Sequence, residues 1–152
     1  MPPPPNPNES LIMYYPAKFS QEDNGYTVTF RDIPEAITCG DDLTDARAMA
    51  ADALLTAMDF YFEDRRTVPM PSVQLQKGEE WVALPASAWA KVLLLNELVH
   101  QNISNSELAR RLSTRPQDVQ RIVNLHHATK IDTLAEALQQ LGLRLNLNIS
   151  TI

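Results

Sequence analysis

The amino-acid sequence predicts an α+β protein with two parts: a small N-terminal domain of the order β-β-β-α-β and an all-helical C-terminal domain that ends in a short β-strand. Residues 11–40 contain turn residues between stretches of strand-forming residues, and residues 85–142 show apolar residues at helical spacing. Strict alternation of apolar and polar residues returns at 143–149. A chain of 152 residues is long enough for two small domains. We expect them to span residues 11–84 and 85–152, after a disordered tail over residues 1–10.

The N-terminal domain opens with a predicted β-hairpin. Prolines in residues 1–10 cannot join a hydrogen-bonded ladder, so the first strand is expected to begin at Leu11. Asn24-Gly25 marks a turn, and the alternation of apolar and polar residues over 26–31 predicts a second strand with one buried face. A short apolar stretch, residues 36–39, closes at Gly40 and is interpreted as a third strand.

A long helix and a returning strand complete this domain. Thr44 can cap the helix, and Asp45 is well placed at the positive end of the helix dipole. Small and apolar residues then recur at helical spacing, which predicts one stripe packed closely on the sheet: Ala46, Ala50, Ala53, Leu54, Ala57 and Tyr61. Prolines at 69 and 71 end the helical pattern, and residues 80–84 are expected to form the fourth strand.

The C-terminal domain is expected to contain four helices. The first spans 86–102, with Ala90, Leu93, Leu94 and Leu98 facing inward. The second, 106–112, is capped by Ser104 or Asn105, and the third runs from Pro116 to about 124. The fourth covers about 132–141 and ends before Gly142.

Composition excludes several classes of protein. The residues after Met1 do not resemble a signal peptide, and the longest apolar run is too short to span a bilayer, so we expect a cytoplasmic protein. Cys39 is the only cysteine, which rules out an internal disulfide and a cysteine-based zinc site. Acidic residues at 32–45 and the pair His126-His127 are weak candidates for metal ligands, and no cofactor or enzymatic activity is expected.

Charge divides unevenly along the chain. Residues 1–84 carry 6 Lys and Arg against 14 Asp and Glu, a net charge of −8, whereas residues 85–152 carry 7 against 5, a net charge of +2. This asymmetry suggests a cationic partner for the first part and a polyanion for the second. Solvated acidic faces would explain the same numbers equally well.

The most informative segment is NSELARRLSTRPQDVQRIVN, residues 105–124. Two short helices that cross closely need a small residue at the crossing, which Ala109 supplies, and apolar inner faces, which Leu108, Leu112, Val119 and Ile122 supply. This spacing resembles the helix-turn-helix of phage-repressor-like proteins. The turn position that commonly holds glycine holds Ser113, where a left-handed backbone would be unfavourable. An ordinary helical hairpin is the alternative.

The resemblance to a helix-turn-helix implies double-stranded DNA as a partner. The second helix would enter the major groove by its N-terminal end, so Gln117, Asp118 and Arg121 become candidates for base contacts. Asp118 could instead hold Arg121 in place. Asn105, Thr114 and Arg115 occupy positions where phosphate contacts are usual.

A second resemblance covers nearly the whole chain after its first ten residues. The stretches GYTVTF (25–30), DIPEA (32–36), TCGD (38–41), the alanine-rich helix and VPMPS (68–72) follow one another as in HicB antitoxins of toxin-antitoxin systems. The resemblance implies a reduced ribonuclease H-like N-terminal domain without nuclease activity. It also implies a partner, a small basic mRNA-cleaving toxin of the HicA type, and autoregulation of the operon.

Which residues touch such a toxin does not follow from the sequence. Charge and expected exposure favour Asp32, Glu35, Asp41 and Asp42. The alternative function is a stand-alone transcription regulator whose N-terminal domain senses a ligand or dimerises.

The terminal run 143–149 predicts self-association. Leu143, Leu145, Leu147 and Ile149 would line one face of a strand that has no neighbour in the helical domain. Pairing with the same strand of a second chain would give a symmetric homodimer, which could assemble further into a tetramer. A return of this strand to the N-terminal sheet of its own chain is the alternative.

Overall fold

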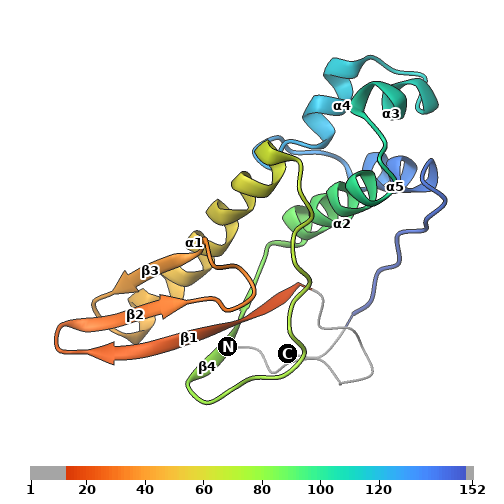
Figure 1. Ribbon diagram of the computed structural model, residues 1–152. Coiled ribbons are helices and arrows are strands. Elements are labelled where there is room, and N and C mark those ends of the chain that lie inside the picture. Colours follow the sequence, from red (N-terminus) through yellow and green to blue (C-terminus); the bar gives the residue numbers. More distant parts are fainter. Residues whose placement is uncertain (1–12, 150–152) are drawn as a thin grey trace. The chain divides into compact units, whose positions relative to one another are not determined.

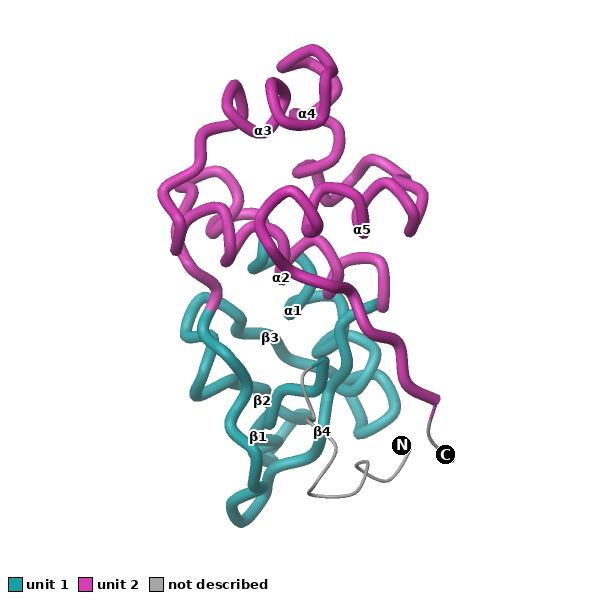
Figure 2. Tube along the Cα trace, turned by 90° about the vertical axis from the view of Figure 1, so that its right-hand side faces the viewer, with its two compact units in different colours: residues 1–58, 69–85, 150–152 teal, residues 59–68, 86–149 magenta. Residues whose placement is uncertain are grey.

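A computed structural model describes residues 13–149 of the chain, which form two compact units (Figure 2). Among the described residues, unit 1 contains 13–58 and 69–85, and unit 2 contains 59–68 and 86–149. Residues 59–68 thus cluster with the helical part, although the sequence placed them in the N-terminal domain. The tail predicted for residues 1–10 lies outside the described residues.

Unit 1 is built on a four-stranded antiparallel sheet with the strand order β3-β2-β1-β4 (Figure 1). The strands are β1 (Tyr14–Glu22), β2 (Gly25–Thr29), β3 (Ile37–Gly40) and β4 (Glu79–Ala83). All four predicted strands are confirmed, although the expected start at Leu11 lies outside the described residues. The alternation predicted for 26–31 buries Val28 and Phe30, which face the core as expected.

Helix α1 (Leu43–Asp64) packs on one face of this sheet, and glycine makes the close approach possible (Figure 1). Alanines at 46, 50 and 57 and Leu54 are buried along the predicted stripe. A Cβ on Gly40 would lie 2.4 Å from the backbone nitrogen of Ala46. A Cβ on Gly25, at φ +142°, would lie 2.2 Å from the Gly40 carbonyl oxygen, so the hairpin turn also needs glycine.

The predicted cap of α1 was wrong by two residues. The helix starts at Leu43, and the Asp42 carboxylate accepts a hydrogen bond from the backbone N–H of Asp45 at 2.8 Å. Asp45 in turn accepts from the backbone N–H of Asp41 at 2.9 Å. Thr44 lies inside the first turn, because the cap is formed by the Asp42 carboxylate, two positions earlier.

Unit 2 consists mainly of α2 (Ala86–His100), α3 (Asn105–Arg111), α4 (Pro116–Ile122) and α5 (Ile131–Gln139). These four helices confirm the prediction, and so do the Ser104 cap of α3 and Pro116 at the start of α4. Their shared core contains Ala90, Leu94, Leu98, Leu108, Ala109, Val119, Ile122, Leu134, Ala137, Leu138 and Leu141. Leu93 was predicted to face inward but is only half-buried, because α2 buries a second stripe that includes Trp89, Val92 and Leu95.

The last turns of α1 and the chain that follows are bonded into unit 2. The Asp59 carboxylate lies 3.0 Å from Nε2 of His126, and Arg65 donates to the Asn105 side-chain oxygen at 2.7 Å. Asn96 binds both backbone groups of Val68, at 2.7 and 3.0 Å. These contacts explain why residues 59–68 belong with the helical core.

The strand predicted for residues 143–149 is not formed within the described chain. Gly142, at φ +81°, ends the helical region, and the following residues are extended but join no β-ladder. Leu145 packs on the helical core, whereas Leu147 and Ile149 are 75% and 99% exposed. A strand needs a neighbouring strand for its backbone groups, and the four-stranded sheet does not include this segment.

Candidate functional site

Helices α3 and α4 form the compact crossing that the helix-turn-helix spacing predicts. Leu108, Ala109 and Val119 are almost fully buried, and Ile122 is 6% exposed. Ala109 provides the small contact surface where the two helices meet, so both lie close to the common core. The two helices are neighbours in the structure (Figure 1), and each is only seven residues long.

The turn between the two helices is left-handed at Ser113, a backbone conformation that the sequence analysis considered unfavourable for this residue. Ser113 has φ +54°, a conformation that residues other than glycine adopt at an energetic cost of order 1 kcal/mol. Two backbone hydrogen bonds offset this strain: Ser113 donates to the Arg110 carbonyl at 3.2 Å, and Thr114 donates to the Ala109 carbonyl at 2.9 Å. The turn therefore keeps its usual geometry without glycine.

Asp118 closes the start of α4 rather than holding Arg121. Its carboxylate accepts from the Thr114 hydroxyl at 2.6 Å and from the Arg115 backbone N–H at 3.3 Å, and it pairs with the Arg115 guanidinium at 3.4 Å. The Thr114 hydrogen bond, with the Arg115 contacts, holds the pKa of Asp118 at about 2, below its ordinary 3.8. The acid thus remains ionised and fixes the turn to the second helix.

The other two predicted base-reading residues are free of such contacts. Gln117 and Arg121 are exposed on α4, and within residues 13–149 their side chains form no hydrogen bond or ion pair. An unpaired guanidinium and an unpaired amide can donate to base edges without first breaking an internal contact. Both side chains are therefore available for hydrogen bonds to another molecule.

The three predicted phosphate-contacting residues flank α3 and the turn. The Asn105 side-chain oxygen is occupied by Arg65, which leaves its amide N–H groups to face other partners. The Thr114 hydroxyl is bound to Asp118, whereas the Arg115 side chain is 73% exposed. On α3, the Glu107 carboxylate pairs with Arg110 and Arg111 at 2.6 and 3.0 Å, and these hydrogen bonds lower the pKa of Glu107 to about 2.

Lys91 is a site residue that the sequence analysis missed. It lies within the apolar run of α2, is 3% exposed, and its ammonium group contacts the end of α4. A lysine between buried positions of an apolar helix is a signal of an internal partner, because a buried charge is rare unless it is paired.

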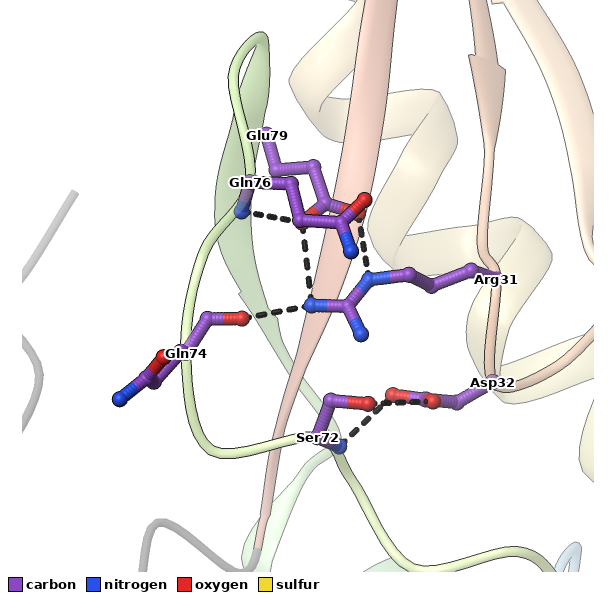
Figure 3. Close-up of polar contacts among 6 residues, drawn as sticks. All are labelled: Arg31, Asp32, Ser72, Gln74, Gln76 and Glu79. Carbon is purple, nitrogen blue, oxygen red and sulfur yellow. Dashed lines mark hydrogen bonds and ion pairs between the residues drawn. The ribbon is translucent and has the colours of Figure 1, made fainter.

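In unit 1, the predicted toxin-contacting carboxylates have different local roles. Asp32 accepts two 2.7 Å hydrogen bonds from Ser72, one from its backbone N–H and one from its hydroxyl (Figure 3). Asp42 caps α1, as described above. Glu35 and Asp41 are exposed. The four therefore do not form one cluster of equivalent groups, and two of them stabilise the fold.

The same close-up shows how the loop before β4 is held. Arg31 pairs with Glu79 at 2.9 Å and donates to the Gln74 carbonyl at 2.6 Å, while Glu79 also accepts from the Gln76 backbone N–H at 2.6 Å (Figure 3). This fixed loop exposes apolar side chains that the sequence analysis did not single out: Met70 at 50%, Val73 at 71% and Leu75 at 40%. Apolar groups presented on an ordered loop are typical of protein-binding surfaces.

Two other features bear on function. Among residues 13–149, no group of three or more His, Cys, Asp or Glu side chains is placed to hold a metal ion. None of the described helices has the length and apolar character needed to cross a lipid bilayer.

Known proteins resemble this chain over most of its length. Residues 14–93 match the family model described as the HicB-like antitoxin of bacterial toxin-antitoxin systems. A protein of Photorhabdus laumondii subsp. laumondii named antitoxin HicB 2 is 58% identical over 138 residues, which cover 91% of this chain and 97% of that protein. Antitoxin HicB of Escherichia coli K12 is 46% identical over 136 residues, 89% of this chain and 98% of its own length.

Acid should destabilise unit 2 over a defined range of pH. Because the folded-state pKa of Asp118 is depressed from 3.8 to about 2, its contribution to stability is present above pH 4 and is lost as the pH falls towards 2. The Asp118→Asn variant should therefore unfold at a lower temperature than the parent at pH 6, and this difference should shrink by pH 2. Thermal unfolding followed by circular dichroism at several pH values measures it.

Glu136→Gln is the matched control for this experiment, because Glu136 is an exposed carboxylate on α5 in the same unit. A difference between Asp118→Asn and the parent that stays constant from pH 6 to pH 2 would contradict the role assigned to the carboxylate.

Proposed function

The chain belongs to the HicB-like family of antitoxins, not to a family of enzymes, and from that premise we propose that it neutralises a HicA-type mRNA-cleaving toxin through unit 1 and represses its own operon through unit 2. The family match covers the whole described sheet of unit 1, which favours toxin binding over ligand sensing for that unit. A protein with both roles acts in the cytoplasm, where the operon and its mRNA are.

The observation that carries the DNA-binding half of the proposal is the exposed side of α4. Gln117 and Arg121 lie one turn apart on a short helix whose inner side is fixed in the core. Arg121 is suited to guanine and Gln117 to adenine in the major groove. Asp118 mainly fixes the start of α4, since its carboxylate already contacts the Thr114 hydroxyl and both the backbone N–H and the guanidinium of Arg115. A remaining lone pair of the carboxylate could still accept a hydrogen bond from a cytosine amino group.

Phosphate contacts would come from the residues around the turn. The exposed Arg115 side chain supplies a cation, and Asn105 supplies amide N–H groups that Arg65 directs away from itself. Thr114 contributes mainly by orienting Asp118. Such contacts position a protein on DNA without reading its sequence.

Toxin binding is proposed for the acidic and apolar surface of unit 1. Glu35 and Asp41 are exposed carboxylates suited to a basic partner, and Asp32 and Asp42 add negative charge while they hold the loop and α1 in place. The fixed loop with Met70, Val73 and Leu75 offers apolar area that needs little ordering on binding.

Self-association is proposed for residues 143–149. Leu145 anchors the segment on the helical core, and the segment then presents Leu147 and Ile149 to solvent in an extended conformation. A second copy of the same segment would pair the backbone groups and cover Leu143, Leu147 and Ile149. The resulting homodimer, or a tetramer built from it, would present two recognition helices to a palindromic operator about one DNA turn, or roughly 34 Å, apart.

Substitution of Arg121 should separate base reading from phosphate binding. We expect Arg121→Ala to weaken operator binding by about 1–3 kcal/mol and to relax the preference at one base pair, because a bidentate contact to guanine is lost. Arg115→Ala should weaken operator and random DNA similarly and reduce the salt dependence. Gel shifts at several salt concentrations measure both effects, and equal losses on the two DNAs for Arg121→Ala would remove this residue from base reading.

Charge reversal on unit 1 should impair neutralisation. Glu35→Lys combined with Asp41→Lys is expected to weaken toxin binding at least about 10-fold, because like charges then face a basic partner. Glu63→Lys with Asp132→Lys makes the same change in net charge on unit 2 and should leave binding unchanged. Growth of cells that co-express the toxin, together with calorimetric titration, provides the readout. Equal affinity in both double variants would place the toxin contact elsewhere.

Charged residues in the terminal segment should produce a monomer. Leu147→Asp with Ile149→Asp alters side chains that are exposed in the single chain, so the fold of unit 2 should persist while the proposed interface is lost. Asn146→Asp with Asn148→Asp adds the same charge to the other side of the segment and should still dimerise. Sedimentation decides between them, and a dimer in the first variant would exclude this segment as the contact.

A further inference from the structure

Lys91 is the one charged residue among the buried side chains of the described chain. Its ammonium nitrogen lies within hydrogen-bond distance of four oxygens: the carbonyls of Asn124 and His127 at 2.6 Å each, the carbonyl of Arg121 at 3.3 Å and the hydroxyl oxygen of Thr129 at 2.9 Å. Three N–H groups thus face four acceptors, so every proton of the buried ammonium group has a partner.

These oxygens lie at the C-terminal end of α4 and in the chain that follows it. The last carbonyls of a helix have no partners within the helix and carry the negative end of its dipole. A cation at that point satisfies the carbonyls and balances the dipole. Burial lowers the pKa of Lys91 from its ordinary 10.5, and the surrounding oxygens favour the protonated form.

The bond to Arg121 links this arrangement to the proposed DNA contact. Lys91 binds the backbone oxygen of Arg121, whose side chain is exposed. A helix of seven residues has few internal hydrogen bonds to resist fraying, so its last turn depends on contacts from outside. Lys91 supplies such contacts from α2, the central helix of the same unit.

We propose that Lys91 is a positioning residue for operator recognition. By holding the last turn of α4, it fixes the position and orientation of this helix, and so the placement of Arg121 and Gln117 in the major groove. This inference rests on the proposed DNA-binding function. A shift of about 1 Å in such a helix is enough to misplace a bidentate contact, so loss of Lys91 should reduce the preference for operator over random DNA more than it reduces binding to DNA in general.

The test uses the full chain and fluorescence anisotropy with operator and random duplexes at 15 °C. Lys91→Met, which keeps the length of the side chain without its charge, should lower the operator-to-random affinity ratio at least about 10-fold. Lys91→Gln keeps two N–H donors and should give an intermediate loss. Thr129→Val is the matched control: it removes one acceptor of the same group but leaves three carbonyls for three protons, and should stay within twofold of the parent.

Circular dichroism and NMR amide shifts accompany each measurement, to show that unit 2 is folded and whether the α4 resonances move. A folded Lys91→Met protein, or a folded Lys91→Gln protein if the first does not fold, with an unchanged affinity ratio would overturn the proposal. Failure of both variants to fold would also overturn it, because Lys91 would then be required for the whole unit rather than for placing α4. If Arg121→Ala also leaves the ratio unchanged, base reading by Arg121 is itself wrong; if only Arg121→Ala lowers it, the role of Lys91 alone is wrong.

Discussion

The buried ammonium group of Lys91 at the C-terminal end of α4 links three parts of the helical unit. A helix as short as α4 leaves most of its carbonyls without internal partners, and burying them unpaired would oppose folding. Lys91 resolves this by placing a cation among four oxygens, although it stands within the apolar stretch of α2. The packing of α2, the end of α4 and the path of residues 124–129 are therefore determined together.

The start of α4 depends on a second local arrangement, in which the stabilising charge is negative rather than positive. Here the unpaired groups are N–H donors, and the Asp118 carboxylate accepts from the Arg115 backbone and from the Thr114 hydroxyl. The strained backbone of Ser113 is tolerated because these bonds and the two at the end of α3 fix its neighbours. The Lys91 ammonium group at the C-terminal end of α4 and the Asp118 carboxylate near its N-terminal end thus both interact favourably with the helix dipole.

The sequence predicted the elements of the fold well and the use of individual polar groups less well. Periodicity identifies strands and helices because burial follows backbone geometry, so β1–β4 and α1–α5 were expected with only small shifts at their ends. The partners of Asp32 and Lys91 depend on tertiary contacts: Ser72 lies forty positions after Asp32, and the oxygens around Lys91 lie thirty or more positions after it. Residues 59–68 were assigned to the other domain for the same reason: the bonds of Asp59, Arg65 and Val68 to unit 2 connect residues far apart in the chain.

The cationic side chains of α3, α4 and the turn between them differ in how far they remain available for the proposed contact with DNA. Glu107 holds Arg110 and Arg111, and Arg111 also binds the Gln140 carbonyl, so both are partly engaged within the fold. Arg115 shares its charge with Asp118 at a longer distance. Arg121 has no such partner among the described residues, and it is also the residue whose backbone Lys91 holds. Base reading favours a donor that has no internal partner and stands on a backbone held in place, and Arg121, the proposed base contact, meets both conditions.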